Sequence, residues 1–329
     1  EQQRNTAVAL LAEMLGQPLF AEDKLQQAKD QLINASAQRQ ASAFDKAVDQ
    51  LFEHAYANHP YAANDARIAH TIHQLTPEDL EAFHRNALNA SNALITLVGD
   101  LSAEQAREVA QQISAALPVG LALPPLQRPA AFEPEIYHLE HPGTQSSLLL
   151  AIPGIDVHHP DAPALALANL ILGGPGATSR LFEELRTQRG LTYSAGSWLA
   201  QAPDSGLWVF FIQVQAKYQD ATMALMQTLL HNYADEGPTE QQLADAKEQL
   251  RGSYLLDSVS NQQISQILAN IGLHRLALDS RQVFIEQVQA LSLDQLKVVL
   301  KKHLKLDTLV QISVGPTVEQ HDLPEPAPS

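Results

Sequence analysis

Residues 186–194, RTQRGLTYS, place Arg186 and Tyr193 seven positions apart. A guanidinium and a phenol both carry hydrogen-bond donors, so the two side chains could hold the acceptor atoms of a ligand. The spacing alone favours a purely structural role. In that role Arg186 and Arg189 lie in the last turn of a helix, where cations interact favourably with the helix dipole. Gly190 ends the helix, and Tyr193 is an ordinary strand aromatic.

A glycine-rich stretch, GGPGATS at residues 173–179, precedes this segment. It has neither the lysine of a phosphate-binding loop nor the third glycine of a dinucleotide fingerprint, so nucleotide binding is not expected. One interpretation is a tight turn before a helix that Thr178 or Ser179 caps. The glycines concerned are Gly173, Gly174 and Gly176.

Composition limits the classes of function. The net charge of −16 argues against binding to a phosphate backbone, which needs a basic surface. The absence of cysteine excludes disulfides, zinc–cysteine sites and thiol catalysis, and it leaves both a bacterial periplasm and a cytoplasm open. No apolar run is long enough to predict a membrane span. A chain of 329 residues suits two domains of roughly 100–200 residues each.

Helix and strand patterns alternate along the chain and predict an α+β fold. Thr76 and Pro77 start one helix, and the segment NALITLVGD after it reads as a strand. Ser102 caps the next helix, with Glu104 in the position of a capping box. A proline-rich, extended linker is predicted at 118–134.

The second half of the sequence predicts five strands and several helices. The segments LTYSAGSWLAQ and GLWVFFIQVQ form an antiparallel pair around a Pro-Asp-Ser-Gly turn. Helices are expected at about 161–173 and 179–189, where apolar residues recur with helical spacing. The other strands are expected at EIYHLE, SSLLLAIPG and TLVQISVGP, and the tail after residue 320 is expected to be loose.

An internal repeat is predicted from two alignments within the chain. The segment that starts at Leu75 matches the one that starts at Leu291, and the segment from Leu25 matches the one from Leu243. We therefore expect the C-terminal part of a first repeat domain at 1–117, the linker at 118–134, a second repeat domain at 135–320 and a flexible tail at 321–329. The register implies that roughly 80 residues of the first repeat precede Glu1 in a longer protein.

The stretch LGGPGATSRLFEELRTQRGLTYSAGSW, Leu172–Trp198, resembles the second-domain signature of the pitrilysin and insulinase family of zinc metallopeptidases, which includes the mitochondrial processing peptidases. HPYA from His59 and the segment Leu75–Asp100 are similar to the end of the family's first domain. This resemblance implies two homologous α+β domains, each an antiparallel sheet packed with helices. In the family the two domains enclose a chamber for unfolded peptides, and the glycine-rich loop would border it.

The family binds zinc through a His-x-x-Glu-His helix and a glutamate from a later helix. The sequence contains no His-x-x-Glu-His, and the position of the third ligand falls on Asn34 or Ala35. HLEH at 138–141 has the wrong spacing and reads as a strand. His70, His73 and the pair His158-His159 are interpreted as solvated or core histidines without a carboxylate to complete a site. We therefore expect no metal in this chain.

In the family, an arginine and a tyrosine of the second domain donate hydrogen bonds to substrate carbonyls, and the phenol helps to stabilise the oxyanion. Arg186 and Tyr193 match that pair. The resemblance thus implies a non-catalytic, substrate-binding subunit of a heterodimeric zinc metalloendopeptidase, with zinc in a homologous partner subunit and unfolded peptide as substrate. Two alternatives remain: a self-sufficient zinc peptidase whose metal motif precedes Glu1, and a structural or peptide-holding core subunit.

Overall fold

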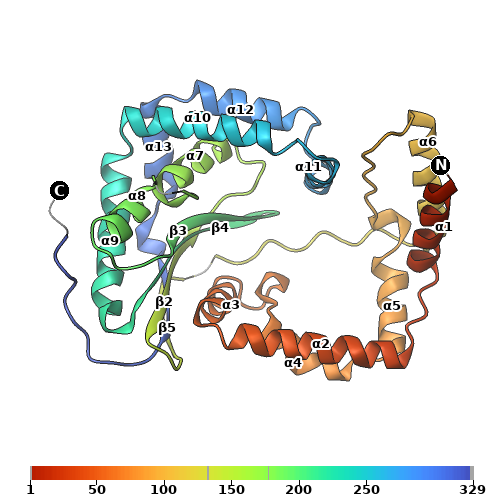
Figure 1. Cartoon of the computed structure of the whole chain (residues 1–329), viewed down its shortest axis with the longest axis horizontal. Helices are drawn as coiled ribbons and strands as arrows, with labels where there is room; N and C mark the ends of the chain where they lie inside the picture. Colours follow the sequence, from red (N-terminus) through yellow and green to blue (C-terminus); the bar gives the residue numbers. More distant parts are fainter. Residues whose placement is uncertain (1, 132, 177, 327–329) are drawn as a thin grey trace. The chain divides into compact units, whose positions relative to one another are not determined.

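The computed structural model describes residues 2–131, 133–176 and 178–326, and these fold into two compact units (Figure 1). The described residues of one unit form helices only, and those of the other form helices and a sheet. The described residues of Glu1–Ala35, Ile68–Gln127 and Leu255–Ser280 form the first unit. Those of Ser36–Arg67, Arg128–Tyr254 and Arg281–Ser329 form the second unit. Each unit therefore draws on both halves of the chain.

The described residues of the second unit form a five-stranded sheet with the order β1-β5-β2-β4-β3. Neighbouring strands are antiparallel, except that β1 and β5 are parallel, so the expected antiparallel sheet is in fact mixed. The predicted hairpin is confirmed, with Pro203 and Asp204 between β3 and β4. The strands are β1 (Glu135–Glu140), β2 (Gln145–Pro153), β3 (Ala195–Ala202), β4 (Ser205–Gln215) and β5 (Val310–Gly315).

Strand β2 is buried on both faces of the sheet, because its run of apolar side chains alternates between two cores. Leu148, Leu150 and Ile152 point into a core that contains residues of α7, α9 and α13. Leu149 and Ala151 pack in a second core with residues of α3. Burying each of these leucines contributes about 1.5–3 kcal/mol, so β2 fixes the sheet between two helical layers.

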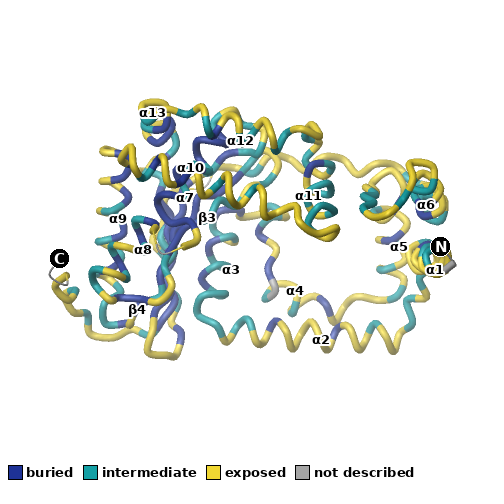
Figure 2. The backbone as a smooth tube through the Cα atoms, turned by 45° about the horizontal axis from the view of Figure 1, so that its top comes forward, coloured by how far each residue is buried: buried dark blue, intermediate teal, exposed yellow. Residues whose placement is uncertain are grey.

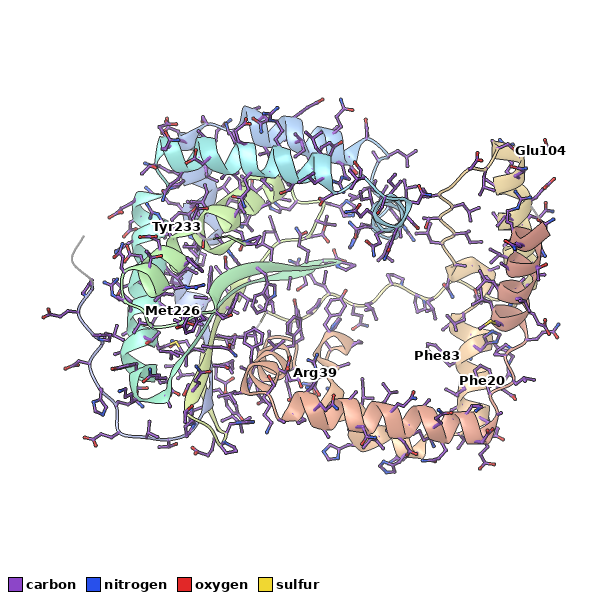
Figure 3. The ribbon with its side chains drawn as sticks, viewed as in Figure 1. Phe20, Arg39, Phe83, Glu104, Met226 and Tyr233 are labelled. Carbon is purple, nitrogen blue, oxygen red and sulfur yellow. The ribbon has the colours of Figure 1, made fainter. Side chains whose placement is uncertain are left out.

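The larger core holds α7 and α9 against the sheet (Figure 3). Met226 and Tyr233 of α9 are fully buried, and the Tyr233 hydroxyl donates to the Ala168 carbonyl of α7 at 3.0 Å. Asn169 Oδ1, also on α7, accepts hydrogen bonds from Trp208 Nε1 of β4 and from Ser197 Oγ of β3, both at 2.8 Å. Figure 2 shows α7 and the sheet among the most buried parts of the chain.

The helix bounds follow the predicted pattern in most of the chain. Among the described helices, none has both the length and the apolar content that a membrane span needs. Single turns of 3₁₀-helix lie at Pro60–Ala62, Ile72–Gln74, Ala90–Asn92, Ala216–Tyr218 and Leu306–Thr308, and a π-helical turn, η4, at Glu183–Thr187. The α-helices are α1 (Gln2–Gly16), α2 (Glu22–Gln40), α3 (Ala43–Ala55), α4 (Asp65–Thr71), α5 (Pro77–Ala87), α6 (Ala103–Ala116), α7 (Ala162–Gly173), α8 (Arg180–Phe182), α9 (Gln219–Glu236), α10 (Glu240–Leu256), α11 (Asn261–Leu273), α12 (Ser280–Ala290) and α13 (Leu293–His303).

In the first unit, capping begins α5 and α6 as the sequence indicates. Thr76 and Asp79 form a capping box at the start of α5. At the start of α6 the box joins Ser102 to Gln105, so the assignment of Glu104 to this position was wrong. The third residue of the helix makes the reciprocal bond, and Glu104 is the second.

The predicted strand NALITLVGD is wrong: residues 93–98 form no strand in the described structure. A strand is defined by a hydrogen-bonded neighbour, and the described residues of the first unit supply none. The segment lies instead beside α11. Leu94 closely approaches Gly272, and Thr96 Oγ1 lies 3.4 Å from Ser265 Oγ.

Two lysines at corresponding positions of the predicted repeat make the same kind of contact. Lys29 Nζ of α2 donates to the carbonyls of His73 and Leu75 at 3.3 and 2.6 Å. Lys247 Nζ of α10 donates to the carbonyls of Gln289 and Leu291 at 2.9 and 2.6 Å. Each ammonium thus donates to carbonyl groups just ahead of a later helix, α5 for Lys29 and α13 for Lys247. Carbonyl groups at the end of a helical segment have no donor within that segment.

Replacing Lys247 with methionine should lower the free energy of unfolding of the second unit by about 1–3 kcal/mol, because two partly buried carbonyls lose their donor. Urea unfolding followed by tryptophan fluorescence measures this unit, since both tryptophans lie in β3 and β4. The control is Lys301→Met at an exposed position of α13. Equal effects of the two substitutions would contradict the assigned role of Lys247.

Candidate functional site

Arg186 and Tyr193 lie together at the surface of the second unit. The Arg186 Cζ atom is 5.2 Å from the centre of the Tyr193 ring and 4.8 Å from the centre of the Phe182 ring. The Tyr193 side chain is 88% exposed. Within the described part of the chain, neither the guanidinium nor the phenol takes part in a hydrogen bond or ion pair that would occupy its donors. The sequence predicted that the two residues are near each other, but not that the rings stack with the cation.

The backbone that carries this pair is firmly held. Leu181 and Leu185 are fully buried, and Leu191 N donates to the Leu185 carbonyl at 3.0 Å. The predicted helix at 179–189 is a short α-helical turn followed by η4, in which Gln188 N donates to the Glu183 carbonyl at 3.0 Å. A π-helical turn shifts side chains out of the regular helical register and is frequent at functional sites.

Arg189 has the structural role that the sequence left open for both arginines. Its Nη1 donates to a carboxylate oxygen of Glu184 at 2.9 Å and to the Glu184 carbonyl at 3.1 Å. The chain then leaves the helical conformation at Gly190, as predicted. Arg189 thus provides the donor to a carbonyl near the helix end. Among the described residues, Arg186 has only its contacts with the two rings.

The glycine-rich stretch combines packing with a turn. A side chain at Gly173 would lie 2.6 Å from the backbone nitrogen of Ser197, so only glycine lets α7 end this close to β3. Gly174 is also buried, whereas Gly176 is exposed and has a φ of +116°. The helix that follows begins after Ser179, whose hydroxyl makes no capping bond. A role of these glycines in bordering a substrate chamber stays a prediction.

The expected positions of metal ligands hold no zinc-binding carboxylate. Asn34 and Ala35 are exposed on α2. HLEH at 138–141 begins within strand β1, as predicted, and His138 Nδ1 lies 2.9 Å from Ser313 Oγ.

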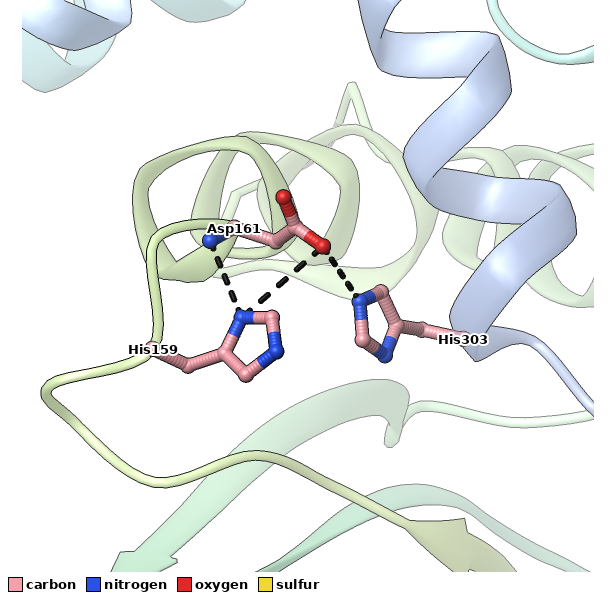
Figure 4. Close-up of side chains that lie close together, drawn as sticks. All are labelled: His159, Asp161 and His303. Carbon is pink, nitrogen blue, oxygen red and sulfur yellow. Dashed lines mark hydrogen bonds and ion pairs between the residues drawn. The ribbon is translucent and has the colours of Figure 1, made fainter.

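The interpretation of His158-His159 as lacking a carboxylate was wrong for His159. Asp161 Oδ2 lies 3.8 Å from His159 Nδ1 and 2.7 Å from His303 Nε2 (Figure 4). His303 follows the other two by more than 140 positions, so no local spacing in the sequence could have indicated the cluster. Burial opposes ionisation of Asp161, but hydrogen bonds from Lys302 and His303 outweigh it and lower the pKa of the carboxyl.

Comparisons with known proteins give consistent matches. A model of the family described as "Peptidase M16 inactive domain" matches residues 74–250. The Helicobacter pylori protein named "Non-peptidase homolog YmxG" is 25% identical over 307 residues, which cover 92% of this chain and 70% of that protein. A Bacillus subtilis protein named "Uncharacterized zinc protease YmxG" is 25% identical over 299 residues, 90% of this chain and 71% of that protein.

The fold also matches a solved structure at higher identity. A crystal structure of a peptidase M16 inactive domain from Pseudomonas fluorescens superposes with a TM-score of 0.93 and is 37% identical. The match covers 98% of this chain and 77% of that one. It therefore includes the Arg186–Tyr193 segment and both units.

The lowered pKa of Asp161 predicts a dependence of stability on pH. The ionised carboxylate stabilises the fold above the ordinary pKa of 3.8, and this contribution is lost as the pH falls through the lower pKa of the folded state. Asp161→Asn should therefore cost about 1 kcal/mol of unfolding free energy at pH 7. The difference from the unchanged protein should shrink as the pH is lowered below 3.8.

Urea titrations at several pH values measure this effect, and Asp235→Asn, at an exposed position of α9, serves as the control. A cost of Asp161→Asn that stayed constant down to pH about 2 would show that ionisation of this carboxyl is not the source.

Proposed function

This chain belongs to the peptidase M16 inactive domain family, and on that premise we propose that it is the non-catalytic, substrate-binding subunit of a heterodimeric zinc metalloendopeptidase. Its substrates are unfolded peptides. A homologous partner subunit holds the zinc, and this chain supplies Arg186 and Tyr193 to that site. The resemblance to the pitrilysin and insulinase family is thereby confirmed, whereas the pairing and the roles of the two residues are part of the proposal.

One observation carries the proposal: an arginine and a tyrosine stack at the surface of a rigid segment, and their donors are not used within the described structure. An arginine whose only role was to stabilise the helix end would donate to carbonyl or carboxylate groups there, as Arg189 does to Glu184. The contact keeps the guanidinium and the phenol near each other, which lowers the entropy lost when both donate to a ligand.

A peptide backbone fits these donors. The guanidinium can donate to one carbonyl of an extended peptide, and the phenol can donate to the neighbouring carbonyl. When a nucleophile attacks that carbonyl, the oxygen gains negative charge, and a donor already in place stabilises the charge more strongly than water does. The partner's zinc would supply the activated water.

The assignment of zinc to the partner rests on this chain's own residues. The sequence has no His-x-x-Glu-His, and Asn34 and Ala35 offer no carboxylate at the third position. The Helicobacter pylori relative bears the name of a non-peptidase homologue. The Bacillus subtilis relative bears the name of a zinc protease, and this favours a second candidate: a longer form of this protein that binds its own zinc through residues ahead of Glu1.

Mixing this protein with its zinc-bearing homologue should create hydrolysis of an unfolded fluorogenic peptide that neither protein supports alone. In the mixture, Tyr193→Phe should lower kcat by a factor of about 10²–10³, because the ring and its contact with Arg186 remain while the donor to the oxyanion is lost. Steady-state kinetics measure the effect.

The chain offers a matched control in a second stacked pair, because Arg281 Cζ lies 4.9 Å from the centre of the Tyr254 ring. Tyr254→Phe should leave kcat unchanged. Equal rates for Tyr193→Phe and Tyr254→Phe would remove the assigned role of the phenol. Hydrolysis by this protein alone would favour the self-sufficient peptidase, and peptide binding without hydrolysis in any mixture would favour a peptide-holding subunit.

A further inference from the structure

The cluster of His159, Asp161 and His303 lies where the loop before α7 meets the last turn of α13, within the second unit. Each residue offers one potential ligand atom, and these atoms all lie within 4.8 Å of one another (Figure 4). The planes of the two imidazole rings are nearly perpendicular, with their centres 5.2 Å apart. In the described part of the chain this is the one group of three such residues close enough to share an ion.

The loop side of the cluster is held by hydrogen bonds from two directions. Asp156 Oδ1 accepts from His158 N at 2.6 Å, and its Oδ2 accepts from Asp204 N in the β3–β4 turn at 2.9 Å. The backbone N–H of Asp161 donates to His159 Nδ1 at 3.0 Å. His159 Nδ1 therefore carries a lone pair rather than a proton, and it would have to exchange this N–H for an ion to act as a ligand.

The helix side is held by packing. Leu300 and Leu304, on either side of His303, are buried in the larger core. The C-terminal end of a helix carries a partial negative charge and favours a cation. Asp161 occupies the N-cap position of α7 but does not cap it: its side chain turns to α13 instead. The carboxylate therefore faces the two imidazoles rather than its own helix.

Two imidazoles and one carboxylate are a ligand set for a divalent transition metal. Mg²⁺ and Ca²⁺ prefer oxygen ligands throughout and are not favoured by it. We propose that His159, Asp161 and His303 bind one such ion, with Zn²⁺ as the best fit, and that the ion fastens the start of α7 to the end of α13. The three side chains are 12–30% exposed, so water can reach the site and complete the coordination.

Binding replaces a hydrogen bond with contacts to the ion. His303 Nε2 lies 2.7 Å from Asp161 Oδ2, and this hydrogen bond must break before both atoms can bind the ion through their lone pairs. Lys302 is the competitor, because its Nζ lies 2.7 Å from the same carboxylate oxygen. Its side chain is 55% exposed and can move into water, so it limits the affinity without blocking the site.

Isothermal titration of the untagged protein with ZnCl₂ at pH 7.5 tests the proposal. We expect one ion per chain with a Kd below about 10 µM. His303→Gln should weaken binding at least about tenfold, whereas Lys302→Met should strengthen it about threefold or more, because a competing cation is removed. The matched control is His158→Gln, which changes an exposed histidine next to the site and should have no effect.

A second measurement keeps the test independent of folding defects in the variants. Co²⁺ bound to two histidines and a carboxylate should give visible absorption bands that Zn²⁺ removes, and Zn²⁺ should raise the melting temperature of the unchanged protein by tryptophan fluorescence. Absence of stoichiometric binding in the unchanged protein would overturn the proposal. So would Zn²⁺ binding that His303→Gln does not weaken or that Lys302→Met weakens.

Discussion

Burial of β2 on both of its faces is the constraint on which the second unit depends. Alternate side chains of this strand enter two cores, so the strand cannot shift by one residue without exchanging them. One core fixes α7, and Asn169 of α7 bonds to both β3 and β4. The close contact of Gly173 with Ser197 then sets where α7 ends. The glycine-rich turn, η4 and the start of β3 follow from these positions, and they carry Arg186 and Tyr193.

Two arginines near the surface pair of Arg186 and Tyr193 have different contacts. Arg189 bonds to Glu184 and stabilises the helix end, which frees Arg186 from that role. Arg186 instead lies between the rings of Phe182 and Tyr193. Such stacking contributes only about 0.5–1 kcal/mol at an exposed site, so stability alone is a weak reason to keep a guanidinium and a phenol together there. A bound peptide that accepts from both is a stronger one.

Several elements could be predicted from the sequence because their cause is local. The strands of the second unit have alternating or continuous apolar patterns, and Thr76 and Ser102 are caps that a short motif identifies. The features that the sequence did not predict depend on contacts between residues far apart along the chain. Residues 93–98 have the composition of a strand, but the described residues of their unit offer no strand to pair with. His303 meets His159 only through the packing of α13, and the carbonyl contacts of Lys29 and Lys247 also join segments more than 40 residues apart.

The central claim is that Tyr193 touches the substrate at the reacting bond. Photocrosslinking from Tyr193→p-azidophenylalanine tests it most directly, in the assembled pair of subunits with a slowly cleaved peptide. The account predicts that mass spectrometry finds the crosslink on the peptide residues next to the cleaved bond, and that the same replacement at Tyr254 gives none. Peptide labelling at equal levels from both positions, or no labelling from position 193, would contradict it.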